Sequence, residues 1–252
     1  MSHFDESNGA FYDEEYFKSI ESRYESGAHG SRIRHILECI GDISDKNILD
    51  LGCGSGFMAK TLSILGANVT GIDYAPDSIA MAKQKYPGVE FVVGSAYELD
   101  KIFAPESFAC VLLLDVIEHM SDHEALMRGI RHVLTTGGHL VISTDNEQFL
   151  WARQPWARYY YGLQRFSREG RAYRALKARE ATVAGRPNYH ASHIHNCSIE
   201  DLEQLLAKHR FQIVRHTTYP IVGVPLRDAL LALGPWRQRG DHQCVVSAKM
   251  PN

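Results

Sequence analysis

The chain has 252 residues, 44% hydrophobic and 23% charged, with a formal net charge of −3 at pH 7. This composition is ordinary for a globular protein, and so small a charge indicates no particular partner. The five cysteines are scattered without a C-x-x-C pair, which argues against a disulfide framework and a cysteine zinc site. The first residues do not form a secretory signal, and no apolar run is long enough to span a bilayer. We therefore expect a cytoplasmic protein without a transmembrane segment.

Strands and helices alternate in the predicted order over the first 145 residues. Residues 11–25, rich in aromatic and acidic side chains, predict one or two leading helices, and residues 33–40 predict an amphipathic helix that ends near Gly41. Strands are predicted at 48–51, 67–73, 89–93, 107–115 and 139–144, and helices at 57–65, 76–86 and 123–134. Pro76 opens the second of these helices, and Gly137-Gly138 is the expected stop signal of the third.

The alternation stops at residue 146 and resumes near residue 198. Ser198 and Asp201 form a capping-box pattern for a helix over 198–209, and strands are predicted at 211–219 and 243–250 with a helix at 228–233 between them. These elements predict an α/β, Rossmann-like, doubly wound and mostly parallel seven-stranded sheet. We expect one domain over 1–252, comprising N-terminal helices (1–44), a ligand-binding core (45–145), an insertion after the fifth strand (146–197) and C-terminal elements (198–252).

The first predicted strand runs into a glycine-rich loop. Glycines occupy alternate positions there: Gly52, Gly54 and Gly56. Glycine permits positive φ and close approach of a ligand to the backbone, and the N–H groups of the next helix attract polar ligands. The dinucleotide fingerprint would need glycine where Phe57 stands. Asp50 could meet an ammonium group, and Asp73, at the end of the second strand, could accept hydrogen bonds from both hydroxyls of a ribose.

Several ordered motifs together resemble the class I S-adenosylmethionine-dependent methyltransferases. They are Leu49–Gly56, Gly71–Asp73, Val93–Ala96, Asp115–His119 and Gly137–Ile142. The resemblance implies that the core binds S-adenosylmethionine, with S-adenosylhomocysteine as the product. It also implies that the Gly52–Gly56 loop holds the methionine part of the cofactor, with Asp50 near its amino group.

The same resemblance implies the remaining cofactor contacts. Asp73 would hold the ribose, Tyr74 would flank the adenine, Ser95 with the Ala96 backbone would meet the adenine edge, and the backbone at Leu114 and Asp115 would close the site beside the sulfonium. Many relatives carry aspartate where Ser95 stands.

The segment Asp115-Val-Ile-Glu-His119 is similar to that of the ubiquinone-biosynthesis O-methyltransferases, in which the corresponding acids and histidine have been linked to a divalent metal. Asp115, Glu118 and His119 would share one face if a helical turn began at Asp115. We favour the alternative without a metal, in which Glu118 caps or pairs and His119 faces the substrate. His119 is then the candidate catalytic base, because an imidazole pKa of about 6.5 suits proton removal near neutrality. Otherwise it only hydrogen-bonds a neighbouring loop, and transfer depends on positioning alone.

The insertion contains two further features. His190, His193 and His195 form a cluster. On an extended segment His193 and His195 would lie on the same side, in position for a metal or acceptor contact, and we interpret the cluster as substrate-facing. Aromatic residues alternate with basic ones over 151–179: Arg153, Arg158, Arg165, Arg168, Arg171, Arg174, Lys177 and Arg179. These residues could form a surface for RNA or for anionic lipid. Because the spacing of three from Arg165 to Lys177 drifts around a helix instead of forming one stripe, it favours a lid.

The sequence thus predicts transfer of a methyl group to a small-molecule acceptor, with the insertion covering the substrate. Oxygen of a phenol or alcohol is favoured, because a basic histidine helps most where a proton must leave. The alternatives are N-methylation of a small amine, and an RNA or protein methyltransferase that docks through residues 151–179. The acceptor and the oligomeric state stay open.

Overall fold

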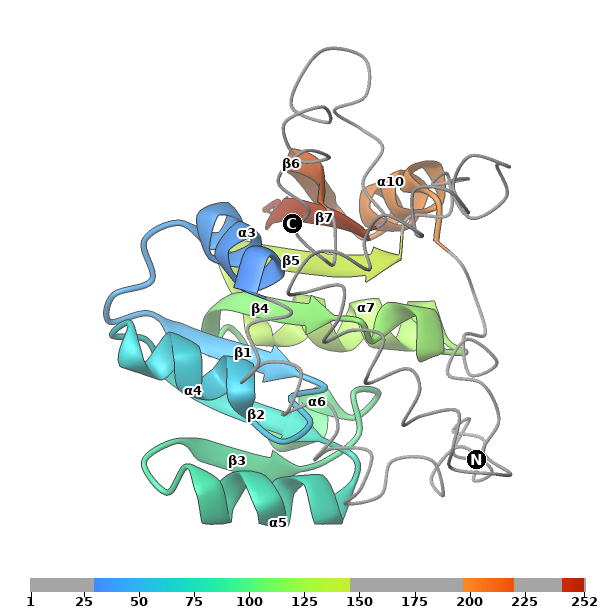
Figure 1. Ribbon diagram of the computed structural model, residues 1–252. Coiled ribbons are helices and arrows are strands. Elements are labelled where there is room, and N and C mark those ends of the chain that lie inside the picture. Colours follow the sequence, from blue (N-terminus) through green and yellow to red (C-terminus); the bar gives the residue numbers. More distant parts are fainter. Residues whose placement is uncertain (1–29, 146–196, 220–241, 252) are drawn as a thin grey trace, which may run out of the picture.

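The computed structural model describes residues 30–145, 197–219 and 242–251 (Figure 1). In chain order the elements are α3 (Gly30–Ile40), β1 (Asn47–Leu51), α4 (Phe57–Ile64), β2 (Asn68–Asp73), α5 (Pro76–Lys85), β3 (Glu90–Val93), α6 (Leu99–Ile102), β4 (Phe108–Leu114), the 3-10 turn η1 (Ile117–His119), α7 (His123–Val133), β5 (Leu134–Asp145), α10 (Ile199–Lys208), β6 (Phe211–Tyr219) and β7 (His242–Lys249). None of these helices is long and apolar enough to cross a membrane.

Most predicted elements in this part of the chain are confirmed to within a residue or two. Pro76 lies in the first turn of α5, and Ser198 and Asp201 form the expected capping box of α10. The predicted helices at 11–25 and 228–233, and the insertion apart from its last residue, lie outside the described residues. The domain boundaries at 44, 145 and 197 stay predictions.

The strands form one seven-stranded sheet in the order β3-β2-β1-β4-β5-β7-β6. The first five strands along this order are parallel, and β7 is antiparallel to both β5 and β6. The carboxyl ends of β1–β5 therefore meet at one edge of the sheet. The end of β6 and the start of β7 lie at the same edge, which confirms the predicted fold.

Side chains of the central strands alternate between two hydrophobic cores, one on each face of the sheet. On one face Leu49 and Val111 pack with residues of α6, α7 and α10. On the other face Ile48 and Leu112 pack with residues of α3, α4 and α5. The sheet therefore lies between two layers of helices (Figure 1), as the unbroken apolar run of β4 predicted.

The stop signal expected at Gly137-Gly138 is wrong. Helix α7 ends at Val133, and β5 begins at the next residue, so both glycines lie inside the strand. Phe108 pairs with Leu134 whereas Cys110 pairs with His139, so residues 135–138 form a bulge in which Gly137 has a φ of 77°. The glycines thus serve a bulged strand instead of a helix end.

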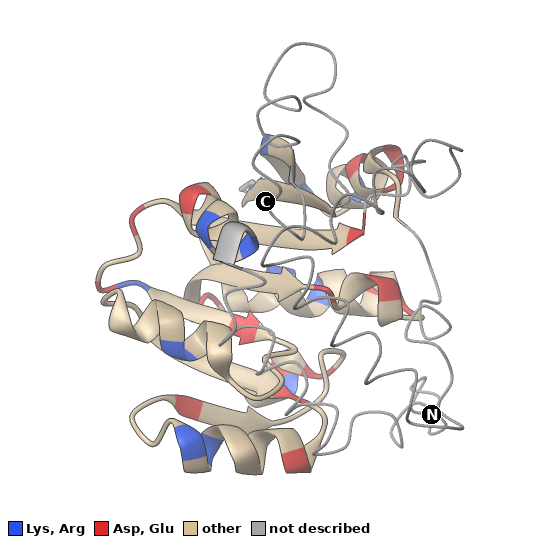
Figure 2. Cartoon of the chain, viewed as in Figure 1, with Lys and Arg blue, Asp and Glu red and all other residues tan. Residues whose placement is uncertain are grey.

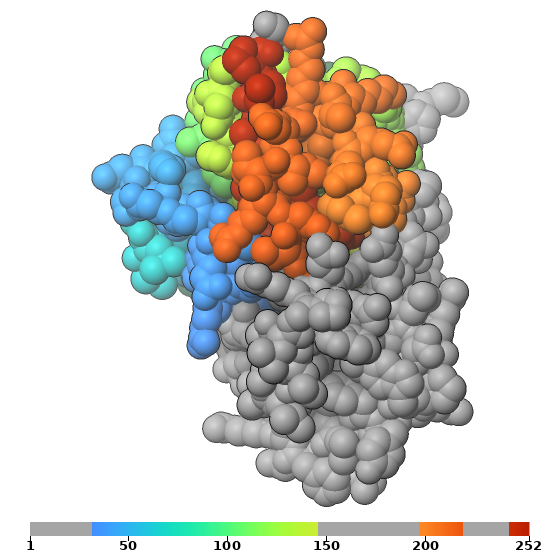
Figure 3. All heavy atoms as spheres, turned by 90° about the horizontal axis from the view of Figure 1, so that it is seen from above, coloured from blue at the N-terminus to red at the C-terminus, as the bar shows by residue number. Residues whose placement is uncertain are grey.

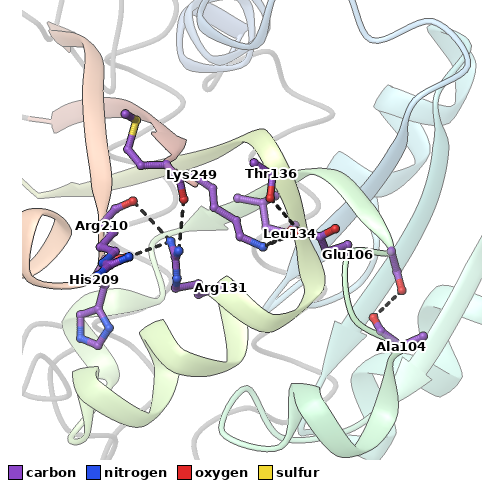
Figure 4. Close-up of polar contacts among 10 residues, drawn as sticks. Ala104, Glu106, Arg131, Leu134, Thr136, His209, Arg210 and Lys249 are labelled. Atoms are coloured by element: carbon purple, nitrogen blue, oxygen red, sulfur yellow. Dashed lines mark hydrogen bonds and ion pairs between the residues drawn. The ribbon is translucent and has the colours of Figure 1, made fainter. Parts of the chain in front are cut away.

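Arg131 of α7 ties the C-terminal elements to the rest of the sheet (Figure 4). Its guanidinium donates hydrogen bonds to the carbonyl oxygens of His209 (3.3 Å) and Arg210 (3.4 Å), just after α10, and of Met250 (3.1 Å), just after β7. Close by, the buried Lys249 ammonium donates to Glu106 (3.1 Å). The Arg131 guanidinium therefore binds carbonyl groups just after two separate elements, α10 and β7.

We expect Arg131→Ala to lower the free energy of unfolding by about 1–3 kcal/mol, since three carbonyl groups lose a charged donor. Arg128→Ala, on the exposed side of the same helix, is the matched control and should change it by less than about 0.5 kcal/mol. Urea unfolding followed by circular dichroism measures both. Equal stability of the two variants would contradict the role given to Arg131.

Candidate functional site

Polar side chains collect at or just beyond the carboxyl ends of the strands, and Figure 2 shows acidic groups at this edge. They are Asp50, Asp73, Asp115, Glu118, Thr144 and Asp145. The edge is where open α/β sheets bind ligands. The parallel topology thus brings together acids that are far apart in the sequence.

The glycine loop after β1 is held tightly against the end of β2. All three glycines have positive φ: Gly52 (78°), Gly54 (52°) and Gly56 (84°). The N–H groups of Gly52 and Cys53 donate to the Ile72 carbonyl at 2.8 and 3.0 Å. A Cβ at Gly56 would lie 2.5 Å from the Phe91 ring. The positive φ expected of these glycines is therefore confirmed, and close packing at Gly56 is a second reason for glycine there.

Asp73, the last residue of β2, fixes the loop through its carboxylate. Oδ2 accepts a hydrogen bond from the Gly54 N–H (2.9 Å), and Oδ1 accepts one from the Ala75 N–H (3.0 Å). Burial raises the pKa of Asp73, and these backbone hydrogen bonds oppose the rise. Each carboxylate oxygen has a second lone pair, so the group retains capacity to accept ribose hydroxyls. Tyr74, half-buried, follows directly.

Asp50 lies beneath the start of α4. The helix begins after Gly56, which has no side chain to cap it, and the Asp50 carboxylate accepts a hydrogen bond from the Ala59 N–H instead. Among the described residues Asp50 Oδ2 is buried without a hydrogen-bond partner. Burial raises the pKa of Asp50 to about 7, and the nearby Asp73 charge adds to the rise.

Arg32 is a residue of this edge that the sequence analysis missed. It is buried near the start of α3, and its Nη1 lies 2.5 Å from Oδ2 of Asp115. Asp115 has a φ of 55°, and its N–H donates to the Ser143 carbonyl (2.8 Å), so the backbone there turns sharply away from β4. A signal was present: Arg32 precedes the buried Ile36 and Cys39 at helical spacing, which puts a cation on an apolar face.

The helical turn after β4 does not begin at Asp115, as the metal hypothesis required. It is the 3-10 turn η1, which starts at Ile117, so Asp115 lies outside it and does not share a helix face with Glu118 and His119. In residues 30–145, 197–219 and 242–251 no cluster of three His, Cys, Asp or Glu side chains is arranged to bind a metal ion. The predicted histidine cluster at 190, 193 and 195 lies outside those ranges.

Glu118 pairs, as the alternative without a metal expected. It is buried and accepts a hydrogen bond from Thr144 Oγ1 (3.0 Å). Burial and the neighbouring Asp115 raise its pKa, which favours the protonated acid. His119 is half-buried and is the last residue of η1.

A second residue at this edge that the sequence analysis missed is His242. Its Nε2 lies 3.0 Å from Oδ1 of Asp145, directly across the β5–β7 ladder. His242 comes immediately before the predicted last strand, and only the antiparallel insertion of β7 beside β5 brings it to Asp145. No local sequence signal indicates that pairing.

The fold is shared with solved methyltransferases. A Haloferax volcanii methyltransferase, solved in complex with the Trm112 methyltransferase activator, is 13% identical with a TM-score of 0.66, over 96% of this chain and 97% of that one. An S-adenosylmethionine-dependent methyltransferase from Mesorhizobium loti is 19% identical with a TM-score of 0.58, over 88% and 97%. At these identities the likeness concerns the fold.

Sequence relatives agree. Residues 49–142 match the family described as "Methyltransferase domain". The chain carries a class I S-adenosylmethionine-dependent methyltransferase domain. The ubiquinone biosynthesis O-methyltransferase of Serratia proteamaculans is 32% identical over 120 residues, which cover 46% of this chain and 49% of that protein, and that of Yersinia pestis is 32% identical over 118 residues. The chain spans about half the length of the curated relatives it matches.

The residues of the methyltransferase domain suit its cofactor, S-adenosylmethionine. The carboxylate of Asp73 has unused acceptor capacity for a ribose. The buried Asp50 oxygen without a partner fits a cationic amino group close by. Burial raises the pKa of both acids, and a bound ammonium or sulfonium nearby would favour their ionised form.

We expect the pH dependence of stability to report on Asp50. Its folded pKa, about 7, lies above the usual 3.8, so the folded state binds the proton more tightly and stability falls as pH rises between these values. Asp50→Asn keeps an acceptor for Ala59 but cannot ionise. The stability of the cofactor-free variant relative to the parent should therefore increase from pH 4 to pH 7, measured by thermal unfolding. A difference that does not vary with pH would contradict the assignment.

Proposed function

We propose that this chain transfers the methyl group of S-adenosylmethionine to an oxygen atom, a phenol or alcohol, of a small molecule. Two observations support the donor: the Asp73 carboxylate holds the glycine loop, and the family match covers this part of the chain. The acceptor atom is proposed from the O-methyltransferase relatives, which align with about half of the chain. The five cysteines, all within the described residues, form no disulfide, which fits a cytoplasmic location.

The proposed cofactor position follows the carboxyl edge from β2 to β4. Asp73 would bind the ribose. Tyr74 and the half-exposed Val93, which pairs with Asp73 across the β2–β3 ladder, offer apolar surface to the adenine. Ser95 and Ala96 would meet the adenine edge. The Ser95 hydroxyl already accepts a hydrogen bond from the Tyr97 N–H (3.2 Å), so its position is fixed by its own turn.

The methionine part would lie between β1 and β4. Asp50 would approach the amino group, and the backbone of Leu114 and Asp115 would flank the sulfonium. Arg32 adds the buried guanidinium at this edge, and a cofactor carboxylate is the anion that it could bind beside Asp115. The site thus offers acids to the cationic groups of the cofactor and a cation to its anionic group.

Methyl transfer requires the protein to align the acceptor with the methyl group of the cofactor, and it needs no protein nucleophile. S-adenosylmethionine supplies an activated methyl group on a sulfonium. The residues of the edge would bind and orient it, and the half-buried His119 would remove the acceptor proton. A small-molecule N-methyltransferase uses the same cofactor site without needing this base. An RNA or protein methyltransferase would instead dock through residues 151–179, which lie outside the described part of the chain.

We expect Asp73→Asn to weaken S-adenosylmethionine binding at least about tenfold, because a charged acceptor of two ribose hydroxyls becomes a neutral amide. Asp100→Asn, exposed on α6, is the matched control and should bind as the parent does. Isothermal titration calorimetry measures both. If the parent chain does not bind S-adenosylmethionine, or the Asp73 variant binds equally well, the proposed donor site is wrong.

We expect His119→Ala to lower kcat about a hundredfold on a phenolic acceptor while leaving cofactor affinity unchanged, since the histidine acts on the acceptor proton. His139→Ala, exposed on β5, is the control. Formation of S-adenosylhomocysteine with a panel of phenols, alcohols and amines gives the readout. Transfer to amines alone would replace the O-methyltransferase proposal with the N-methylation alternative, and an unchanged kcat would leave positioning as the source of rate.

A further inference from the structure

Helix α3 packs over β6 and β7 on the face of the sheet opposite α7 and α10, and Figure 3 shows α3 beside β6 at the surface. Where these elements meet, two cysteines lie together. Cys39 is on the buried side of α3, and Cys244 lies in β7; both are buried, reduced thiols. The proposed methyl transfer uses neither of them.

The surrounding residues place the two cysteines on either side of Thr217 of β6. Cys244 and Thr217 are directly paired across the β6–β7 ladder, so their side chains point to the same face. The Cys39 sulfur lies 3.6 Å from Thr217 Oγ1, and Thr217 is the ladder partner of Cys244. Two thiols on separate elements therefore lie beside the same threonine at the helix–sheet interface.

Polar neighbours make this pair unlike the other buried thiols. The His35 ring, one turn before Cys39, has its Nε2 3.7 Å from the Cys39 sulfur and 2.7 Å from Thr217 Oγ1. The neighbouring Cys244 and His35 side chains lower the pKa of Cys39 against the effect of burial, and the pKa of Cys244 is raised. In contrast, burial raises the pKa of Cys110 to about 12. One of the two paired thiols is therefore the preferred thiolate, and reactivity follows the thiolate.

We propose that Cys39 and Cys244 are a redox-sensitive pair that hydrogen peroxide converts to a disulfide joining α3 to β7. The Cys39 thiolate attacks one peroxide oxygen, the O–O bond breaks, and the departing hydroxide takes up the proton that Cys39 lost, forming water. The Cys244 sulfur then attacks the sulfenic sulfur, the S–S bond forms, and the S–O bond breaks. The hydroxyl group leaves as a second water with the Cys244 proton. The two thiols together lose two electrons, and the peroxide gains them.

The disulfide also acts on the cofactor edge, and this part rests on the proposed function. A disulfide holds its sulfur atoms about 2.05 Å apart, closer than two thiols in contact, so α3 is drawn toward β7. Arg32 lies on the same buried side of α3 as Cys39 and pairs with Asp115 at 2.5 Å. Oxidation therefore displaces Arg32 from Asp115 and weakens cofactor binding.

The test uses the full chain, purified under reducing conditions and treated with a small molar excess of hydrogen peroxide. After alkylation of remaining thiols, mass spectrometry of a non-reduced digest should find a peptide pair linked through Cys39 and Cys244, and dithiothreitol should remove it. Cys39→Ala and Cys244→Ala should lack it, whereas Cys110→Ala should retain it. Calorimetry of the oxidised chain should show S-adenosylmethionine affinity reduced at least about fivefold and restored by dithiothreitol.

The other outcomes separate the redox pair, its coupling to the cofactor edge, and the proposed function. Oxidation of Cys39 to a sulfinic acid without a link to Cys244, or no reaction at either thiol, overturns the redox pair, and this readout needs no variant to fold. A linked chain with unchanged affinity overturns the coupling through Arg32. Absence of S-adenosylmethionine binding in the reduced chain contradicts the proposed function, and the linked peptide would still be found. Circular dichroism before each measurement confirms that the alanine variants are folded.

Discussion

The central parallel strands are covered by helices on both faces, and this burial constrains where polar chemistry can occur. Residues such as Leu112 and Val111 each enter a closed apolar core, on opposite faces of the sheet. A charged group in the middle of these strands would lose its hydration without compensation. The polar side chains are therefore displaced to the carboxyl edge, where backbone N–H groups of loops and helix starts are available.

Each acid of that edge is stabilised in a different way. Asp73 accepts backbone N–H groups from the glycine loop and from its own turn. Asp50 accepts an N–H of α4, Asp115 pairs with Arg32, and Glu118 accepts a hydroxyl hydrogen bond while burial favours its protonated form. Closely spaced carboxylates cannot all remain ionised without such partners. The acids of the carboxyl edge therefore differ in their partners and in how strongly burial favours the protonated form.

Helix α3 connects this edge to the antiparallel end of the sheet. Its buried side contains Arg32 at the carboxyl edge, Ile36 in the core, and Cys39 against β6 and β7. Arg215 of β6 donates to the Glu38 carbonyl (2.9 Å), a further link between helix and sheet. A displacement of α3 would therefore move both the Arg32–Asp115 pair and the Cys39 contact with β6. This is the physical basis for coupling the thiol pair to the proposed cofactor site.

Local sequence signals predicted the elements with good accuracy where one period dominated. The capping box before α10, Pro76 at α5 and the apolar run of β4 each depend on neighbours in the chain, and each was confirmed. The prediction failed at Gly137, because a glycine pair is compatible with both a helix end and a bulge. The pairing of Leu134 with Phe108 selects the bulge. That choice depends on a strand distant in sequence.

The sequence by itself determined the fold class and which acids stand at the strand ends, because strand ends and glycine spacing depend on neighbouring residues in the chain. The parallel topology then places these acids at one edge of the sheet. Only the tertiary structure decided which partners these residues have. It brought Arg32 to Asp115, His242 to Asp145, and Cys39 to Thr217 beside Cys244, and it excluded Asp115 from the helical turn that contains Glu118. Such contacts join side chains whose neighbours are set by the packing of α3 and by the antiparallel insertion of β7, and no period in the sequence encodes either.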